Sequence, residues 1–181
     1  KESSELINMH TGEDAPSSPS DYLTQGQVHA VFLYEDGRKV LVAAGDDGVH
    51  EIELRPAILG KQILKTGTII FDVYYKDDKL YLAEGDGGFS VWKYDLNNTP
   101  ECIGRYKPEN QGIYQLLIDA DKKYAFLHVG SNILEIVDIS NPEEMKQVSS
   151  DTPYIGLMYR FPIARGFLKN RFAASSWHAF G

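Results

Sequence analysis

The chain is poor in cysteine: its 181 residues contain one, Cys102. A single thiol cannot form a disulfide within the chain, and it cannot build a zinc site that needs several thiolates. The segment around it, 100–104, has the pattern of an apolar strand. We therefore expect Cys102 to be a buried structural thiol rather than a nucleophile.

Long apolar runs and an excess of positive charge are also absent. No window approaches the roughly 18 consecutive apolar residues that predict a membrane-spanning helix. The chain has 18 Lys and Arg against 26 Asp and Glu, which gives a formal net charge of −8. Because nucleic-acid phosphates require a basic surface, this balance argues against a nucleic-acid partner, and it gives no attraction to an anionic membrane.

The sequence lacks the short motifs that carry catalysis or bind cofactors. It contains no Gly-x-Ser-x-Gly, no phosphate-binding loop and no dinucleotide fingerprint. Its histidines never stand at the His-x-x-x-His spacing of a metal site. We therefore expect no cofactor and no metal, and these motifs leave open whether the protein is an enzyme.

The sequence does contain one pattern that is repeated three times. Each copy consists of an apolar run, a turn with glycine, and a run in which apolar and polar residues alternate. The copies occupy residues 39–54, 79–96 and 123–139, and their hairpin glycines are Gly45, Gly85 and Gly130. These glycines stand 40 and then 45 residues apart. Strand hairpins that recur at about 40–45 residues are typical of β-propeller blades.

We therefore predict an all-β fold, a β-propeller with three complete four-stranded blades and part of a fourth. An irregular polar lead-in covers residues 1–26, and the propeller covers 27–181, divided into 27–67, 68–111, 112–151 and a partial 152–181. The fourth unit ends after two strands, so we expect a fragment of a larger ring. The remainder of the propeller, or another chain, would close that ring and cover its open strand edges.

Individual residues of the repeat carry further expectations. Val42, Leu82 and Phe126 lie on the most apolar strand of each copy, shortly before the glycine, so we expect three buried equivalents. We expect His50, beside glutamates, to be exposed, and His128, between apolar neighbours, to lie in the core.

The turns of the first two copies are acidic, with Asp46 and Asp47 in one and Asp86 in the other. Such oxygen ligands on a glycine loop suit calcium. The third copy has Ser131 and Asn132 there instead. We therefore interpret these segments as hairpin turns whose residues tolerate positive φ, and not as metal loops.

Two segments resemble a known repeat. Residues 136–142 read Ile-Val-Asp-Ile-Ser-Asn-Pro, and 92–100 is a looser version. With the glycine turn and alternating strand before them, they resemble the LVIVD-repeat β-propellers of bacteria and archaea, over roughly residues 27–151. Residues 51–56 depart from the pattern, because they lack its Asp and Asn. The resemblance implies a ring of about seven blades in an extracytoplasmic location (secreted, periplasmic or at the cell surface), with no catalytic residues to carry over.

Polar residues within the innermost strand of each blade are candidates for ligand binding, because this strand lines the central channel. The alternative is a hydrated lining whose polar groups bind water and one another. A Trp-His pair near the end of the sequence is a second candidate, since it can stack on a sugar and hydrogen-bond to it; the alternative is ordinary packing. The candidates are His29, Asp72, Gln115 and Arg160 in the channel, and Trp177 and His178 as the pair.

These observations favour a binding or scaffold domain that presents a channel mouth to a protein or glycan ligand. The alternative is a carbohydrate-active enzyme on the same scaffold, either a glycoside hydrolase or a polysaccharide lyase. A chain with 11 Tyr, 8 Phe and 2 Trp permits sugar stacking, but aromatic residues serve sheet packing equally well. A cofactor-dependent oxidoreductase finds no support in the sequence.

Overall fold

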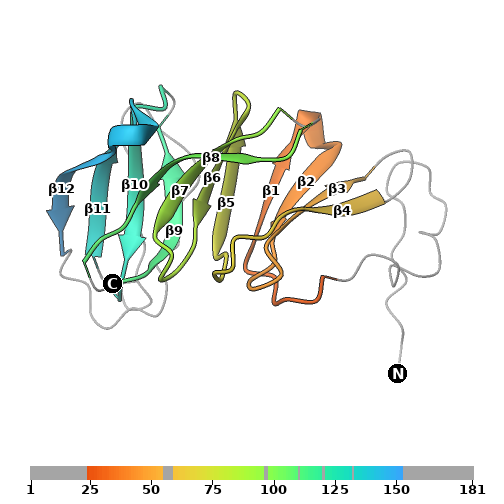
Figure 1. The fold of residues 1–181 in the computed structure, drawn as a ribbon, viewed down its shortest axis with the longest axis horizontal. Helices are drawn as coiled ribbons and strands as arrows, with labels where there is room; N and C mark the ends of the chain where they lie inside the picture. Colours follow the sequence, from red (N-terminus) through yellow and green to blue (C-terminus); the bar gives the residue numbers. More distant parts are fainter. Residues whose placement is uncertain are drawn as a thin grey trace, which may run out of the picture.

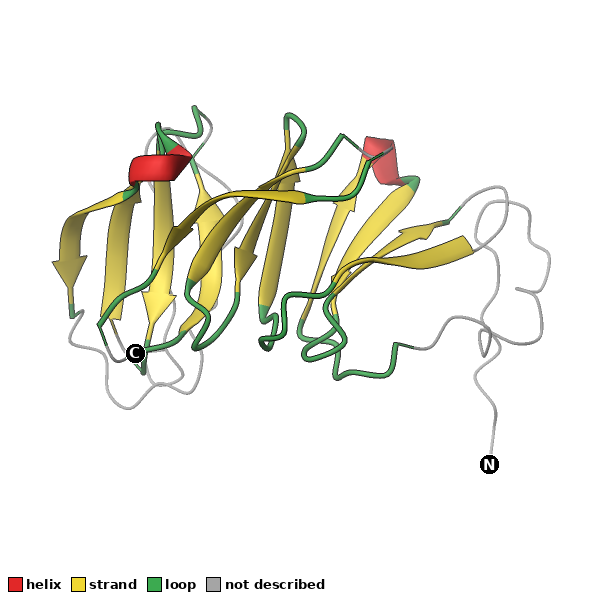
Figure 2. Ribbon diagram, viewed as in Figure 1, coloured by secondary structure: helices red, strands yellow, loops and turns green. Residues whose placement is uncertain are grey.

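The protein forms three antiparallel four-stranded sheets that stand side by side, each with its strands in chain order (Figures 1 and 2). The computed structural model describes residues 24–54, 59–95, 98–109, 111–119, 121–131 and 133–152. Blade 1 contains β1 (Ala30–Tyr34), β2 (Lys39–Ala43), β3 (Val49–Glu53) and β4 (Leu59–Leu64). Blade 2 contains β5 (Asp72–Lys76), β6 (Lys79–Ala83), β7 (Phe89–Lys93) and β8 (Glu101–Tyr106). Blade 3 contains β9 (Ile113–Ile118), β10 (Tyr124–Val129), β11 (Ile133–Asp138) and β12 (Lys146–Asp151).

The predicted all-β propeller fold is confirmed for these three blades. Two short 3-10 helices lie in the connections between strands: η2 (Glu35–Gly37) joins β1 to β2, and η3 (Pro142–Glu144) joins β11 to β12. In the part of the chain that the structure describes, no helix has the length and apolar character needed to cross a membrane. Most of the predicted lead-in and nearly all of the predicted fourth blade lie outside the described residues.

The glycine turns form equivalent hairpins in blades 1 and 2. In the β2–β3 hairpin the N–H of Ala44 donates to the Gly48 carbonyl at 2.8 Å, and in β6–β7 Glu84 donates to Gly88 at 2.8 Å. Asp46 and Asp86 are therefore the same position of two equivalent turns, and both are exposed. The structure agrees with the reading of these segments as hairpin turns.

Neighbouring blades are joined through the hairpin glycines. Gly45 of blade 1 forms a β-bridge with Ile70, which leads into β5, and Gly85 of blade 2 forms the same bridge with Ile113 of β9. One apolar cluster fills the space between blades 1 and 2, and a second fills the space between blades 2 and 3. The strands of blade 2 thus bury both faces, which explains why β6 is apolar at nearly every position.

Carboxylate–tyrosine hydrogen bonds add a polar link at both interfaces. Glu51 of β3 accepts from Tyr34 and, at 3.2 Å, from Tyr94 of blade 2. Burial, followed by the neighbouring Glu51, raises the pKa of both phenols, so both remain protonated donors. Tyr106 of blade 2 donates to Glu135 of blade 3 at 2.6 Å. Each interface is therefore fixed by a buried acid as well as by apolar packing.

One expectation about the register is wrong. Val42 is 5% exposed and Leu82 is fully buried, but Phe126 is only half-buried. Leu127, three residues before its hairpin glycine like the other two, is the fully buried equivalent. Because successive strand residues face opposite sides, a shift of one residue moves Phe126 to the other face of its sheet.

Two further expectations about single residues are also wrong, while a third is confirmed. Cys102 is exposed, because β8 is the outermost strand of blade 2 and pairs only with β7. His50 is buried at 8% exposure, because its ring lies against the Asp47 side chain, with Nε2 3.0 Å from the Asp47 carboxylate. His128 lies in the core at 2% exposure, as expected, and burial lowers the pKa of its ring.

Candidate functional site

Three aromatic positions are in register across the three blades. The N–H of His29 donates to the Ala43 carbonyl and that of Phe71 donates to Ala83, both at 2.8 Å, so His29 and Phe71 occupy equivalent positions. Tyr114 follows the bridging Ile113 as Phe71 follows the bridging Ile70, and is therefore the third equivalent. All three lie beside the hairpins at 44–48 and 84–88; we call this side of the blades the hairpin-turn face.

The three rings form a continuous row. The centroids of His29 and Phe71 lie 4.6 Å apart with the planes tilted by 44°. Those of Phe71 and Tyr114 lie 5.0 Å apart at 82°, an edge-to-face arrangement. A Cβ added at Gly85 would lie 2.7 Å from the Phe71 ring, so the turn needs glycine there for the ring to approach the backbone. The row therefore depends on the hairpin glycine as well as on the aromatic residues.

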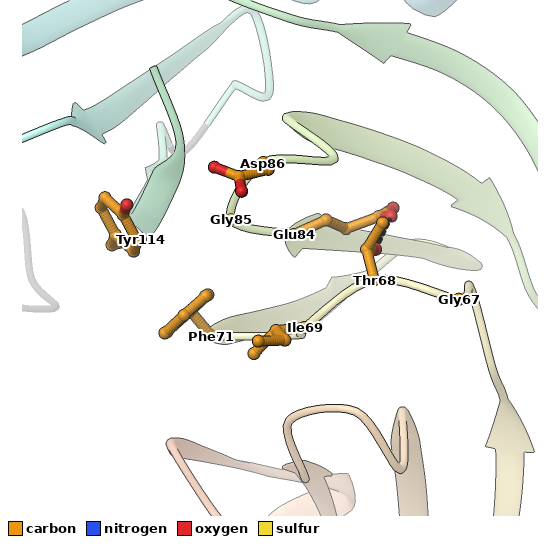
Figure 3. A pocket seen from close by; sticks show the side chains of 8 residues that line it. All are labelled: Gly67, Thr68, Ile69, Phe71, Glu84, Gly85, Asp86 and Tyr114. Carbon is orange, nitrogen blue, oxygen red and sulfur yellow. Dashed lines mark hydrogen bonds between the residues drawn. The ribbon is translucent and has the colours of Figure 1, made fainter. Parts of the chain in front are cut away.

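A cavity of about 310 Å³ opens beside this row, between the hairpin of blade 2 and the start of blade 3 (Figure 3). Figure 3 shows Phe71, Tyr114 and Asp86 around the same space, with the Asp86 carboxylate directed toward the side of Tyr114. The lining residues are Gly67, Thr68, Ile69, Phe71, Glu84, Gly85, Asp86 and Tyr114. We call this cavity the blade 2 pocket. It combines aromatic surface with an exposed acid, a lining suited to a small ligand group.

The second acid of the pocket, Glu84, is fully buried and saturated with donors. Its Oε2 accepts from Thr68 Oγ1 at 2.8 Å and from Arg105 Nη1 at 3.1 Å, and its Oε1 accepts from Ser90. Trp92 donates to Ser90 at 2.7 Å, and the Arg105 guanidinium lies 5.4 Å from the centroid of the Trp92 ring. Glu84 therefore serves the internal structure of blade 2, and Asp86 is the acid that the pocket offers to a ligand.

The structure separates the channel candidates predicted from the sequence. His29 belongs to the aromatic row, whereas Asp72 and Gln115 stand one residue further along. Asp72 is 5% exposed; one of its oxygens accepts from the N–H of Val73 at 2.9 Å, and the other from that of Leu116 in blade 3 at 3.1 Å. Asp72 therefore holds two blades together, and its carboxylate is occupied.

Gln115 is the equivalent of Asp72 in blade 3. Its side chain is half-buried, and its Oε1 is enclosed without a hydrogen-bond partner among the described residues. Arg160 and the pair Trp177 and His178 lie outside the described residues. Of the predicted candidates, the structure thus brings His29 to the aromatic row and places Asp72 between two blades. It does not test Arg160, Trp177 or His178.

The acidic turn of blade 1 is occupied by protein groups. The pKa of Asp47 is lowered, first by the backbone N–H of Gln25, which donates at 2.8 Å, and then by His50, whose Nε2 lies 3.0 Å away. Gln62 donates to the same carboxylate at 3.1 Å. Across the described residues, no group of three or more His, Cys, Asp or Glu is arranged to hold a metal ion. Asp47 is thus engaged in fixing its own turn.

Phe71, Tyr114, Asp86 and the Glu84–Arg105 pair were not among the residues predicted for a site. A signal for the aromatic row does exist, because His29, Phe71 and Tyr114 stand 42 and 43 residues apart, close to the blade repeat. No sequence spacing indicates the pairing of Glu84 with Arg105, since it depends on how β8 folds back on β7.

Solved structures resemble the chain, and two of them align with it at 13% sequence identity each. A computationally designed protein, Ika8, aligns with a TM-score of 0.65 over 95% of this chain and 49% of its own. The β-propeller domain of Cps50 (Swd1) from Myceliophteria thermophila aligns with a TM-score of 0.54 over 78% of this chain and 48% of its own. At this identity the likeness shows the fold alone, and the chain spans about half the length of these structures.

No protein-family model matches the sequence, and no curated protein matches it. The chemistry of the site therefore has to be argued from its own residues.

Proposed function

We propose that the chain is part of an extracytoplasmic β-propeller that acts as a binding or scaffold domain and presents its hairpin-turn face to a protein or glycan ligand. The observation that carries this proposal is the blade 2 pocket, where Phe71, Tyr114 and Asp86 border one cavity of about 310 Å³. Aromatic rings supply large apolar contact area, and a few polar groups beside them orient a ligand. The resemblance of 136–142 to LVIVD repeats supports both the family and the extracytoplasmic location.

The carbohydrate-active enzyme is the weaker alternative. A glycosidase needs two carboxyl groups free to act on the scissile bond, and the pocket does contain two acids, Glu84 and Asp86. However, the carboxylate of Glu84 is fully buried and is held by Arg105, Thr68 and Ser90. A carboxylate that is occupied in this way cannot take up an acid or nucleophile role without breaking its own supports.

Binding through the pocket predicts a specific loss in the variant Tyr114→Ala. An aromatic contact contributes about 1–1.5 kcal/mol, so affinity for the ligand should fall about tenfold. Isothermal titration of cellulose and chitin oligosaccharides and of basic peptides measures this. Tyr124→Ala, which removes a tyrosine outside the pocket, is the matched control. Equal affinities for the two variants and the parent protein would contradict binding at this site.

We further propose that the outer face of blade 1 is covered by another blade, from the remainder of the propeller or from another chain. Val31 and Leu33 are 59% and 58% exposed on this face. The equivalents of Val31 in the next blades, Val73 and Leu116, are 0% and 2% exposed, because the preceding blade covers them. Two adjacent exposed apolar side chains on a face that is buried elsewhere in the repeat indicate a missing neighbour.

Two measurements on this chain test whether another blade covers this face. Light scattering gives the size of the assembly, and a hydrophobic dye reports exposed apolar surface. We expect either an assembly larger than one chain, which Val31→Ser with Leu33→Ser reduces to the monomer, or a monomer that binds the dye at this face. The first outcome identifies another chain as the neighbour, and the second identifies the remainder of the propeller. A cooperatively folded monomer that binds no dye would contradict the proposal.

A further inference from the structure

The electrostatics of the blade 2 pocket distinguish between classes of ligand. Of its eight lining residues two are acidic and none is basic. The neighbouring cation, Arg105, approaches Glu84 at 3.1 Å and lies over Trp92, so its charge serves the buried acid. Asp86 remains exposed, with no ion pair to it within the described part of the chain. The pocket therefore carries one negative charge that is free to meet a ligand.

The aromatic side chains of the pocket also favour a positively charged ligand. The face of an aromatic ring attracts a cation that lies within about 6 Å of its centroid. Phe71 and Tyr114 both line the pocket, and they meet edge to face at 82° with their centroids 5.0 Å apart. Asp86 borders the same space (Figure 3). Aromatic surface and a carboxylate around one space suit a compact cation.

The pocket has acceptors as well as aromatic surface. Apart from the Asp86 carboxylate, the lining side chains carry the hydroxyls of Thr68 and Tyr114 and the carboxylate of Glu84, which already accepts from Thr68, Arg105 and Ser90. A primary ammonium is strongly hydrated and gives up bonds to water when it lies against aromatic rings. An alkylated ammonium gives up less hydration and presents methyl groups to the rings. The lining therefore favours an alkylated ammonium over a bare one.

We propose that the blade 2 pocket binds an alkylammonium group, and that its natural ligand is a methylated lysine side chain of a protein partner. This inference rests on the proposed function and selects the protein from its two ligand classes. Phe71 and Tyr114 provide the cation–π surfaces and Asp86 provides the counter-charge. The formal net charge of −8 adds a long-range attraction to a basic partner and none to an anionic membrane.

The test compares a cation with a neutral molecule of the same shape. Choline and 3,3-dimethylbutan-1-ol differ in that a quaternary nitrogen replaces a quaternary carbon, and each is titrated into the protein by calorimetry. We expect choline to bind about tenfold more tightly than the alcohol, because the cation–π and charge contributions are lost with the nitrogen. A peptide with trimethyllysine should likewise bind more tightly than the same peptide with unmodified lysine.

A matched pair of variants tests whether Asp86 supplies the counter-charge for the bound cation. Asp86→Asn should weaken choline binding about fivefold and leave the alcohol unchanged. Asp46→Asn, at the same exposed position of the blade 1 hairpin, should change neither. Both substitutions are on exposed turns, and thermal melting checks that the variants remain folded.

The outcomes separate this inference from the proposed function. Equal affinities for choline and the alcohol, or equal effects of Asp86→Asn and Asp46→Asn, would overturn the ammonium site. If oligosaccharides bind, Tyr114→Ala weakens them and choline does not bind, the binding domain stands and the ligand is a glycan. If no oligosaccharide, basic peptide or choline binds the folded protein, both proposals fail.

Discussion

Replacing Gly88 with valine is expected to lower the free energy of unfolding by about 3 kcal/mol or more, since a β-branched residue is forced into the left-handed region and against backbone. Gly88 closes the β6–β7 hairpin with a φ of +91°. A Cβ there would lie 2.4 Å from the carbonyl oxygen of Tyr106 on β8, which cannot move without disrupting the outer strand. Urea unfolding followed by circular dichroism measures the loss.

Gly67→Ala is the matched control for this prediction. Gly67 also has a positive φ of +81°, but a Cβ added there meets nothing within 4 Å. Its substitution should therefore cost the backbone strain alone, about 1 kcal/mol. If Gly88→Val were no more destabilising than Gly67→Ala, the close approach of hairpin and outer strand would be wrong.

Replacing Arg105 with leucine should destabilise the protein by about 3 kcal/mol, because it leaves the carboxylate of Glu84 buried without its cation. Glu84 is fully buried, and Arg105 is the one cation within ion-pair distance of it among the described residues. The variant also removes the guanidinium from the Trp92 ring. Chemical denaturation of the single and double variants measures the effect.

The double variant Glu84→Leu with Arg105→Leu tests the cause of that loss. Removing both charges leaves no buried acid to compensate, so much of the stability lost in Arg105→Leu should return. Arg105→Lys, which keeps the charge, should lose less than Arg105→Leu. Additive losses in the double variant would mean that the two side chains act independently.

The blade architecture could be predicted from sequence because each hairpin is a local signal. Each of the four-residue turns, at 45–48 and 85–88, lies with its two flanking strands within about 20 contiguous residues. The burial of Phe126 could not be predicted in the same way. In β10 the neighbouring residues Phe126 and Leu127 are both apolar and face opposite sides of the sheet, so the distance to the glycine, and not the apolar pattern, identifies the buried residue.

The site could be predicted only in part, since it is built from contacts between blades. The sequence marked Asp72 as polar within an apolar strand, but its bond to the N–H of Leu116 joins residues 44 apart in the chain. The same holds for Phe71 and Tyr114, which meet across two blades. Their equivalence becomes visible once the register of the bridges at Gly45 and Gly85 is known.

The central claim is that the hairpin-turn face carries a ligand site at the junction of blades 2 and 3, and amide NMR during a choline titration tests it most directly. We predict that the largest shifts fall on residues 67–71, 84–86 and 112–114, and that the corresponding hairpin of blade 1, at 44–48, stays unchanged. Shifts that spread evenly over the three blades, or that concentrate on the blade 1 hairpin, would contradict the account.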